Sequence, residues 1–139
     1  VDPALAARLL SVDAETLIAG GGGVPSIPRD GPLFGNLFES LVTLSIRVYA
    51  QAAEARAYHL RERDGRHEVD VIVARGDQCV VAIETKLSAT VDDDDVKHLR
   101  WLQEQMGDQL LDAVIVTTGS QAYRRPDGVA VVPAALLGP

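Results

Sequence analysis

Three charged residues interrupt two apolar, strand-like runs between His67 and Ser88. The runs are rich in valine and isoleucine, yet Asp70, Glu84 and Lys86 stand at positions where a purely structural strand would carry apolar side chains. Buried charges cost several kcal/mol unless they are paired or bind a metal ion. This segment is therefore the first candidate for a functional site.

The two runs are predicted to pair as an antiparallel hairpin across the turn at residues 75–78. A register that places Ile72 opposite Ala82 also places Asp70 opposite Glu84. Lys86 shares the face of Glu84, because residues two apart on a strand point the same way. We therefore expect two carboxylates and one ammonium to converge on one patch of the sheet.

The long helix predicted from Leu33 to about Ala53 supplies a further acid, Glu39. Its spacing places it on the face of Val42 and Ile46, so that the carboxylate points toward packed surroundings. Because apolar residues occupy nearly every face, we expect this helix to be central and largely buried. Solvent exposure or a local arginine partner is the ordinary alternative for a single acidic residue on a helix.

These residue types suit metal-dependent attack of water on a phosphodiester. Carboxylate oxygens bind Mg²⁺ or Mn²⁺, which keep several waters and accept phosphate oxygens. In this scheme Asp70 and Glu84 bind the metal, with the backbone carbonyl of Thr85 as a further candidate ligand. Glu39 completes the site through a water or a second metal, and Lys86 orients the attacking water or stabilises developing negative charge. In the alternative, Lys86 pairs with both acids and no metal is needed.

The first hairpin of the predicted meander is the one basic region of an otherwise acidic chain. It holds Arg56, Arg61, Arg63 and Arg66, while the formal net charge of the chain is -7. That charge argues against a free-standing nucleic-acid binder, since phosphate binding depends on Lys and Arg. These arginines are candidates for local DNA contacts, or else they protect an edge strand from pairing with other chains.

The remaining segments predict an α/β domain. Asp2 and Pro3 begin a short helix, a second is expected over Asp13–Ala19, and a Gly- and Pro-rich loop follows from Gly20. Residues 1–29 therefore form a connector, the rest a single domain, and the chain looks like a piece of something longer.

Within that domain the helix of residues 33–53 is followed by three strands, the first hairpin turning at Asp64-Gly65. A helix from about Thr90 to Gly107 follows, with the aspartates of residues 92–95 in its first turn and Val96, Leu99, Leu102 and Met106 on its apolar face. The apolar run of residues 111–118 predicts a central strand. A loop, a short edge strand over residues 129–132 and a last helical turn complete the chain.

Composition restricts the class of protein further. No apolar stretch approaches the roughly 20 residues that cross a bilayer, and no signal peptide is recognisable. The single Cys79 forms no internal disulfide, so a cytoplasmic location is expected.

The order of acids and lysine resembles a known superfamily. Glu39, Val69-Asp70 and Glu84-Thr85-Lys86 are similar to the E…(V)D…ExK pattern of the PD-(D/E)xK nucleases, whose restriction-endonuclease-like core is an αβββαβ unit with a central mixed sheet. More closely, GPLFGNLFESLV, RERDGRHEVDVIVARGDQCVVAIETKLSATVDDDDVKHLRWLQEQMGD, AVIVTTG and VAVVPAALL resemble an uncharacterised domain found C-terminal to an AAA-type ATPase module in many bacterial and archaeal proteins. The resemblance covers most of the chain from about residue 30 onward, and the predicted nuclease-like domain spans residues 30–139.

The resemblance implies a divalent-metal-dependent DNA endonuclease domain with Glu39, Asp70, Glu84 and Lys86 as site residues and an ATPase module on the full-length chain. A catalytically silent module that serves as an interaction, homodimerisation or regulatory platform for the ATPase is the alternative.

Overall fold

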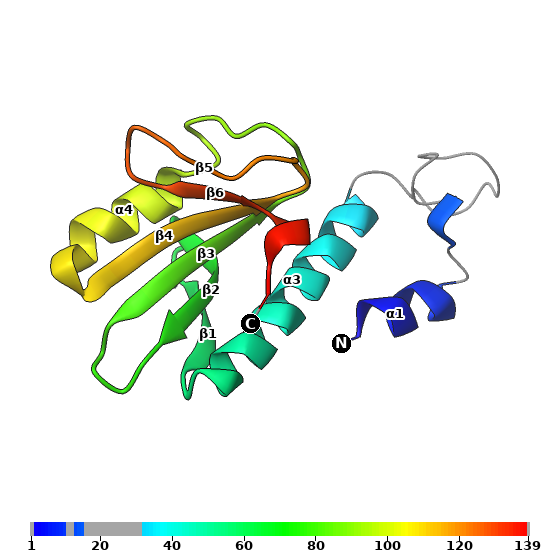
Figure 1. The fold of residues 1–139 in the computed structure, drawn as a ribbon, viewed down its shortest axis with the longest axis horizontal. Helices are drawn as coiled ribbons and strands as arrows, with labels where there is room; N and C mark the ends of the chain where they lie inside the picture. The colour runs from blue at the N-terminus through cyan, green and yellow to red at the C-terminus, as the bar shows by residue number, and fades with distance from the viewer. Residues whose placement is uncertain (1, 11–12, 16–31, 139) are drawn as a thin grey trace.

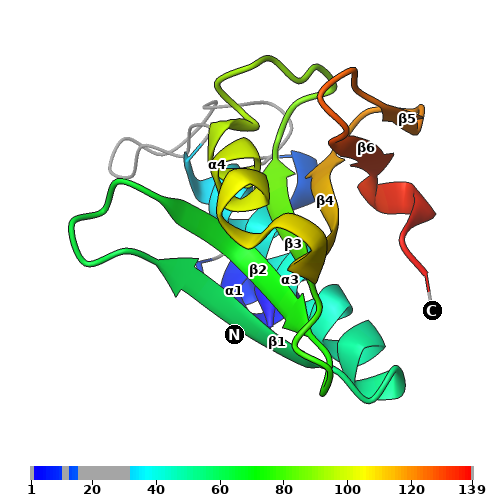
Figure 2. The same cartoon turned by 90° about the vertical axis from the view of Figure 1, so that its left-hand side faces the viewer.

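The structure is a computed structural model that describes residues 2–10, 13–15 and 32–138. Its core is a sheet of six strands, with the long helix α3 (Pro32–Ala52) on one face and α4 (Lys97–Met106) on the other (Figures 1 and 2). The predicted α/β class, with a central mixed sheet flanked by helices, is confirmed.

The sheet has the strand order β1-β2-β3-β4-β6-β5. The first three strands, β1 (Arg56–Arg61), β2 (Glu68–Ala74) and β3 (Val80–Lys86), form the predicted antiparallel meander. The chain then crosses through α4, and β4 (Leu110–Thr117) pairs with β3 in parallel, as a helical crossover requires. β6 (Ala130–Pro133) lies parallel to β4.

The expected edge strand near residues 129–132 exists but does not form the edge. A two-residue strand, β5 (Tyr123–Arg124), pairs antiparallel with β6 and covers it. The loop prediction for this segment is therefore wrong at these two residues. The helical turn after β6 is a 3₁₀ turn, Ala134–Leu136, and a second 3₁₀ turn, Gly107–Gln109, joins α4 to β4.

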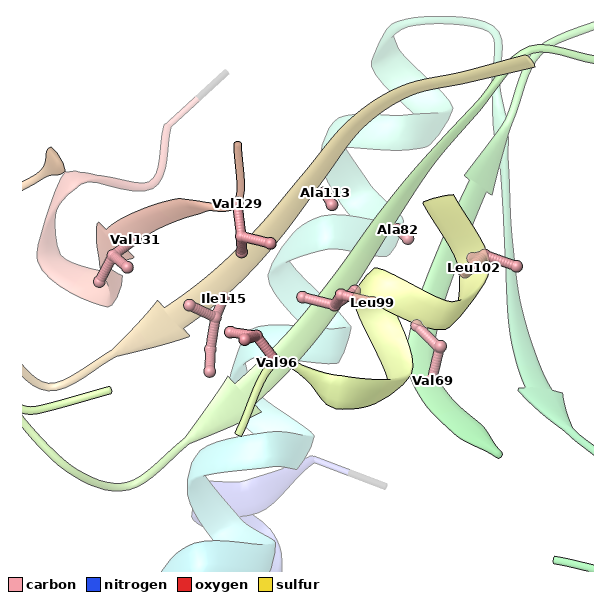
Figure 3. Close-up of a cluster of buried hydrophobic side chains, with 9 residues drawn as sticks. All are labelled: Val69, Ala82, Val96, Leu99, Leu102, Ala113, Ile115, Val129 and Val131. Carbon is pink, nitrogen blue, oxygen red and sulfur yellow. The ribbon is translucent and has the colours of Figure 1, made fainter. Parts of the chain in front are cut away.

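The face covered by α4 holds one apolar cluster, which Figure 3 displays. Leu99 and Leu102 of α4 pack against side chains from four strands, so this helix is fixed to the sheet by burial of aliphatic surface. The cluster consists of Val69, Ala82, Val96, Leu99, Leu102, Ala113, Ile115, Val129 and Val131. A second cluster under α3 contains Val42, Ile46, Val71, Ile83 and Val116.

Helix α3 is less buried than its composition predicts. Val42, Ile46 and Ala50 face the sheet, but Leu41, Leu44 and Val48 are between 42% and 56% exposed. The prediction of a largely buried helix is therefore correct only for its inner face.

The first helix, α1 (Pro3–Leu9), lies against α3 (Figure 1). The predicted cap is present, because the Asp2 carboxylate accepts hydrogen bonds from the amides of Ala4 and Leu5 at 2.8 and 3.1 Å. Of the second predicted helix only the start, at residues 14–15, is described, and the Gly- and Pro-rich loop lies outside the described residues.

Helix α4 begins later than predicted. It starts at Lys97, and the aspartates lie in a turn before it, so their assignment to the first helical turn is wrong. The cause is local: the Asp92 side chain accepts hydrogen bonds from the amides of Asp94 and Asp95 at 3.0 and 3.1 Å and closes a turn there. The helix ends at Gly107 (φ 51°), as predicted. No helix in the described part of the chain is long and apolar enough to cross a membrane.

Candidate functional site

The predicted register between β2 and β3 is the observed one. Ile72 pairs with Ala82, and Val71 pairs with Ile83, so one further step along the two strands brings Asp70 to Glu84. The alternating pattern of small and β-branched residues was sufficient to predict this pairing, since a slip of one residue would turn the buried face outward.

Asp70 lies at an irregularity of β2 and is anchored to β3. The pairing of β1 with β2 shifts between Tyr58 and Leu60, so that an extra residue of β2 lies opposite His59. The carboxylate of Asp70 turns to Thr85, whose amide and hydroxyl both donate to its Oδ2 at 2.8 Å. These bonds fix one oxygen of Asp70 beside Glu84.

Glu84 is the most perturbed acid of the site. Its Oε1 is buried and has no hydrogen-bond partner among the described residues. Burial, followed by the charge of Asp70, raises the pKa of Glu84 to about 9, and Glu68 and Glu39 act in the same direction. With a pKa of about 9, the Glu84 carboxyl holds its proton at neutral pH.

Glu39 interacts electrostatically with Asp70 and Glu84. Partial burial of its carboxyl, followed by the charge of Asp70, raises the pKa of Glu39, and His59 opposes the shift. The residue is nevertheless exposed, although Val42 and Ile46 on the neighbouring turns are buried. The expectation that Glu39 points into packed surroundings is thus wrong, whereas its electrostatic link to Asp70 agrees with the predicted grouping.

Two neighbours of the acid group were missed by the sequence reasoning. Glu68 precedes Asp70 by two residues and binds His59, whose Nε2 lies 3.1 Å from its Oε1. The Nδ1 of His59 lies 3.2 Å from the carbonyl of Asp70. The period-two spacing of Glu68 and Asp70 was visible in the sequence, but the position of His59 depends on the irregular pairing of β1.

Lys86 does not pair with the two acids. Its ammonium binds Asp95, and both side chains are mostly buried, at 27% and 18% exposure. Asp95 also accepts a hydrogen bond from the amide of Asp92 at 2.8 Å. The alternative in which Lys86 satisfies Asp70 and Glu84 directly is therefore wrong.

The four arginines of the basic hairpin differ in whether they have an ion-pair partner. Arg61 lies 3.8 Å from Glu68, and Arg66 pairs with Asp64. Within the described residues, Arg56 and Arg63 have no ion-pair partner. Arg56 lines a hollow of about 340 Å³ together with Glu54, Tyr58, Ala74, Arg75 and Gly76.

An aromatic group lies between the basic hairpin and α4, and it too was missed. His67 stacks on Trp101, with ring centroids 4.0 Å apart, and meets His98 edge to face at 5.8 Å. Glu62 holds the Nδ1 of His67 at 2.8 Å. A ring contact between segments distant in the chain leaves no spacing signal in the sequence.

The chemistry of the site is compatible with a divalent cation. Mg²⁺ commonly uses one or two carboxylates and completes its octahedron with water and substrate oxygens. Asp70 and the orphaned oxygen of Glu84 match that requirement. No group of three or more acidic, histidine or cysteine side chains within the described ranges could hold a metal by itself, so water ligands would have to complete the coordination.

The fold and site define an α/β domain with a mixed six-stranded sheet and a pair of acidic side chains, Asp70 and Glu84, where β2 and β3 meet. The chain belongs to the family described as Domain of unknown function (DUF4143), whose profile matches residues 34–137. No curated protein matches the sequence.

Proposed function

We propose that this domain is a divalent-metal-dependent phosphodiesterase of the PD-(D/E)xK type that acts on DNA beside an ATPase module of the same full-length chain. The observation that carries the proposal is the Asp70–Glu84 pair. One buried oxygen of Glu84 has no hydrogen-bond partner among the described residues, and burial, followed by the charge of Asp70, raises the pKa of this carboxyl to about 9. A cation is the partner that such a pair needs, since it would stabilise both charged carboxylates at once.

Each site residue has a distinct role in this proposal. Asp70 and Glu84 would hold Mg²⁺ or Mn²⁺, with the Thr85 carbonyl as a further ligand and Glu39 contributing through a water. When bound, the ion supplies an acidified water and neutralises charge on the phosphate. The two hydrogen bonds from Thr85 keep the carboxylate of Asp70 in one orientation. Lys86 would stabilise negative charge that develops near the phosphate.

The free arginines favour local contact with DNA. Arg56 and Arg63 are not engaged in ion pairs with described residues, whereas Arg61 and Arg66 are. Tyr58 is 52% exposed beside Arg56 and offers an aromatic face for an unpaired base. Because the chain carries a net charge of -7, we expect weak binding that depends strongly on salt.

A cleavage assay tests the proposal. The protein is incubated with Mg²⁺ or Mn²⁺ and a panel of linear, single-stranded and branched DNA, together with Asp70→Asn and Glu84→Gln variants. Glu104→Gln is the matched control, because Glu104 is an exposed acid of α4 and is not among the charges that shift the pKa of Glu84. We expect wild type and the control to cut, with at least a hundredfold loss in the two site variants. Equal cutting by all four proteins, or none by wild type, would refute the proposal.

A second candidate is a silent module that docks onto the ATPase or onto another copy. The ion pair of Lys86 with Asp95 favours it, because the lysine is already engaged. The exposed apolar row of Leu41, Leu44 and Val48 on α3 also favours it, as an apolar surface suited to a partner. For this candidate, Leu44→Glu would disrupt association in sedimentation experiments, while Asp70→Asn would not.

A further inference from the structure

The loop between β3 and α4 is tied to the rest of the molecule at several points. The amide of Thr118 donates to the Ser88 carbonyl at 3.2 Å. At the same place the backbone of Ala89 approaches Gly119 so closely that a Cβ added to this glycine would lie 3.2 Å from the Ala89 carbonyl oxygen. The beginning of the loop is therefore held against the end of β4.

Arg125 holds the middle of the loop. Its guanidinium donates to the carbonyl of Val91 at 3.3 Å and binds the carboxylate of Asp93. Asp127 holds the same guanidinium through bonds of 3.0 to 3.3 Å. The side chains of Arg125 and Asp127 are only 13% and 20% exposed, so Asp127 fixes the guanidinium largely out of water, while the Asp93 carboxylate that it binds is 84% exposed.

The end of the loop presents Asp95 to Lys86. Burial works against the charge on Asp95, but the hydrogen bonds from Lys86 and from the Asp92 amide prevail and lower its pKa. Lys86 is the last residue of β3 and shares the face of Glu84, two residues before it. The ammonium therefore has two possible sets of partners: Asp95 of the loop, or the acid pair on its own sheet.

We propose that Asp95 is a positioning residue that holds the Lys86 ammonium off the acid pair, and that Arg125 keeps the loop in the place where Asp95 can do so. Released from Asp95, Lys86 competes with a cation for Asp70 and Glu84. The loop thus controls whether the acid pair is available to a metal. The competition with metal rests on the function proposed above, whereas the placement of Lys86 does not.

The placement of Lys86 is tested first, by a double-mutant cycle in urea unfolding with Lys86→Met and Asp95→Asn. We expect Asp95→Asn to raise the equilibrium constant for unfolding about tenfold when Lys86 is present, and to change it much less when residue 86 is Met, which corresponds to a coupling of about 1.4 kcal/mol. Asp94→Asn is the matched control, because Asp94 is the adjacent, 91% exposed aspartate and only approaches Lys97 at 4.0 Å. A coupling of Lys86 to Asp95 no larger than its coupling to Asp94 would overturn the proposal.

The clamp is tested with Arg125→Gln against Arg124→Gln. Arg124 is the adjacent arginine, but it binds Asp112 of β4 and leaves the loop alone. We expect Arg125→Gln to reduce the Lys86–Asp95 coupling severalfold and Arg124→Gln to leave it unchanged. An unchanged coupling in Arg125→Gln would remove Arg125 from the proposal.

Competition with metal is tested by Mn²⁺ titration calorimetry. We expect Asp95→Asn to weaken Mn²⁺ binding about tenfold, and the Lys86→Met/Asp95→Asn double variant to restore it. Simple damage to the fold would not be repaired by a second substitution. If Asp95→Asn leaves the Kd for Mn²⁺ unchanged, Lys86 does not compete with the metal for the acid pair. If wild type binds no Mn²⁺, the proposed function is refuted, and the double-mutant cycle alone decides the position of Lys86.

Discussion

Replacing Glu84 with glutamine removes a carboxyl that folding forces to remain protonated. In the unfolded chain this group has a pKa near 4.5, while burial, followed by the charge of Asp70, raises the pKa of Glu84 to about 9 in the folded protein. Between these values the unfolded state releases the proton and the folded state keeps it. The wild type therefore loses stability as the pH rises from about 4.5 to 9, and the loss is absent below that range.

The size of the effect follows from the shift. One pKa unit corresponds to 1.36 kcal/mol, so the 2.5 units between the unfolded pKa and pH 7 amount to about 3 kcal/mol. Glutamine carries no proton equilibrium and its amide can still donate a hydrogen bond to Asp70. Glu84→Gln should thus stabilise the protein by up to about 3 kcal/mol at pH 7 and by little at pH 4.5.

Urea unfolding at several pH values, in buffer containing EDTA, measures this difference. Glu104→Gln is the control and should follow the wild-type pH dependence. The reasoning is refuted if the stability difference between Glu84→Gln and wild type is the same at pH 4.5 and pH 8, or if the variant is the less stable protein at pH 8.

Three further predictions concern the acid pair and its supports. Asp70→Asn removes the largest charge acting on Glu84, so the pKa of Glu84 should fall toward its ordinary value. The ¹³C chemical shift of the Glu84 carboxyl, measured against pH, reports this pKa, and a titration curve like that of wild type would contradict the prediction. Leu99→Ala leaves a cavity at a fully buried position between α4 and the sheet, and should cost about 3 kcal/mol in urea unfolding, whereas Leu111→Ala, at a 53% exposed site, should cost less than 1 kcal/mol. Gly107→Ala forces a side chain onto a backbone with φ 51°, so it should cost about 1 kcal/mol, although nothing lies within 4 Å of the added Cβ; a neutral result would mean that the helix end adjusts freely.

The hairpin of β2 and β3 could be predicted because its information is local. Alternation fixes the faces, and the turn at residues 75–78 fixes the register, so Asp70 and Glu84 met as expected. The crossover to β4 and the end of α4 at Gly107 followed from equally local signals. The family match covers residues 34–137 and therefore includes all of these elements.

The partner of Lys86 could not be predicted for a physical reason. Asp95 reaches the lysine only because Asp92 closes a turn before α4 and Arg125 holds the loop from a segment 32 residues beyond Asp93. Four adjacent aspartates look alike in a sequence, yet one closes the turn, one binds Arg125 and one binds Lys86. Long-range contacts of this kind leave no periodicity.

The burial of α3 was overestimated for a related reason. A helix with apolar residues on most faces is normally buried. Here the sheet covers only the side of Val42 and Ile46, and Leu41 and Val48 remain exposed. Composition alone does not reveal how many partners a helix has.

Anomalous diffraction from a crystal soaked in Mn²⁺ at pH 8 tests the proposed metal site most directly. We expect an anomalous peak within coordination distance of Asp70 and Glu84, with Lys86 still bound to Asp95, and no peak at this place in Glu84→Gln. A soaked wild-type crystal without anomalous density between Asp70 and Glu84, or with the Lys86 ammonium lying between them, would contradict this prediction.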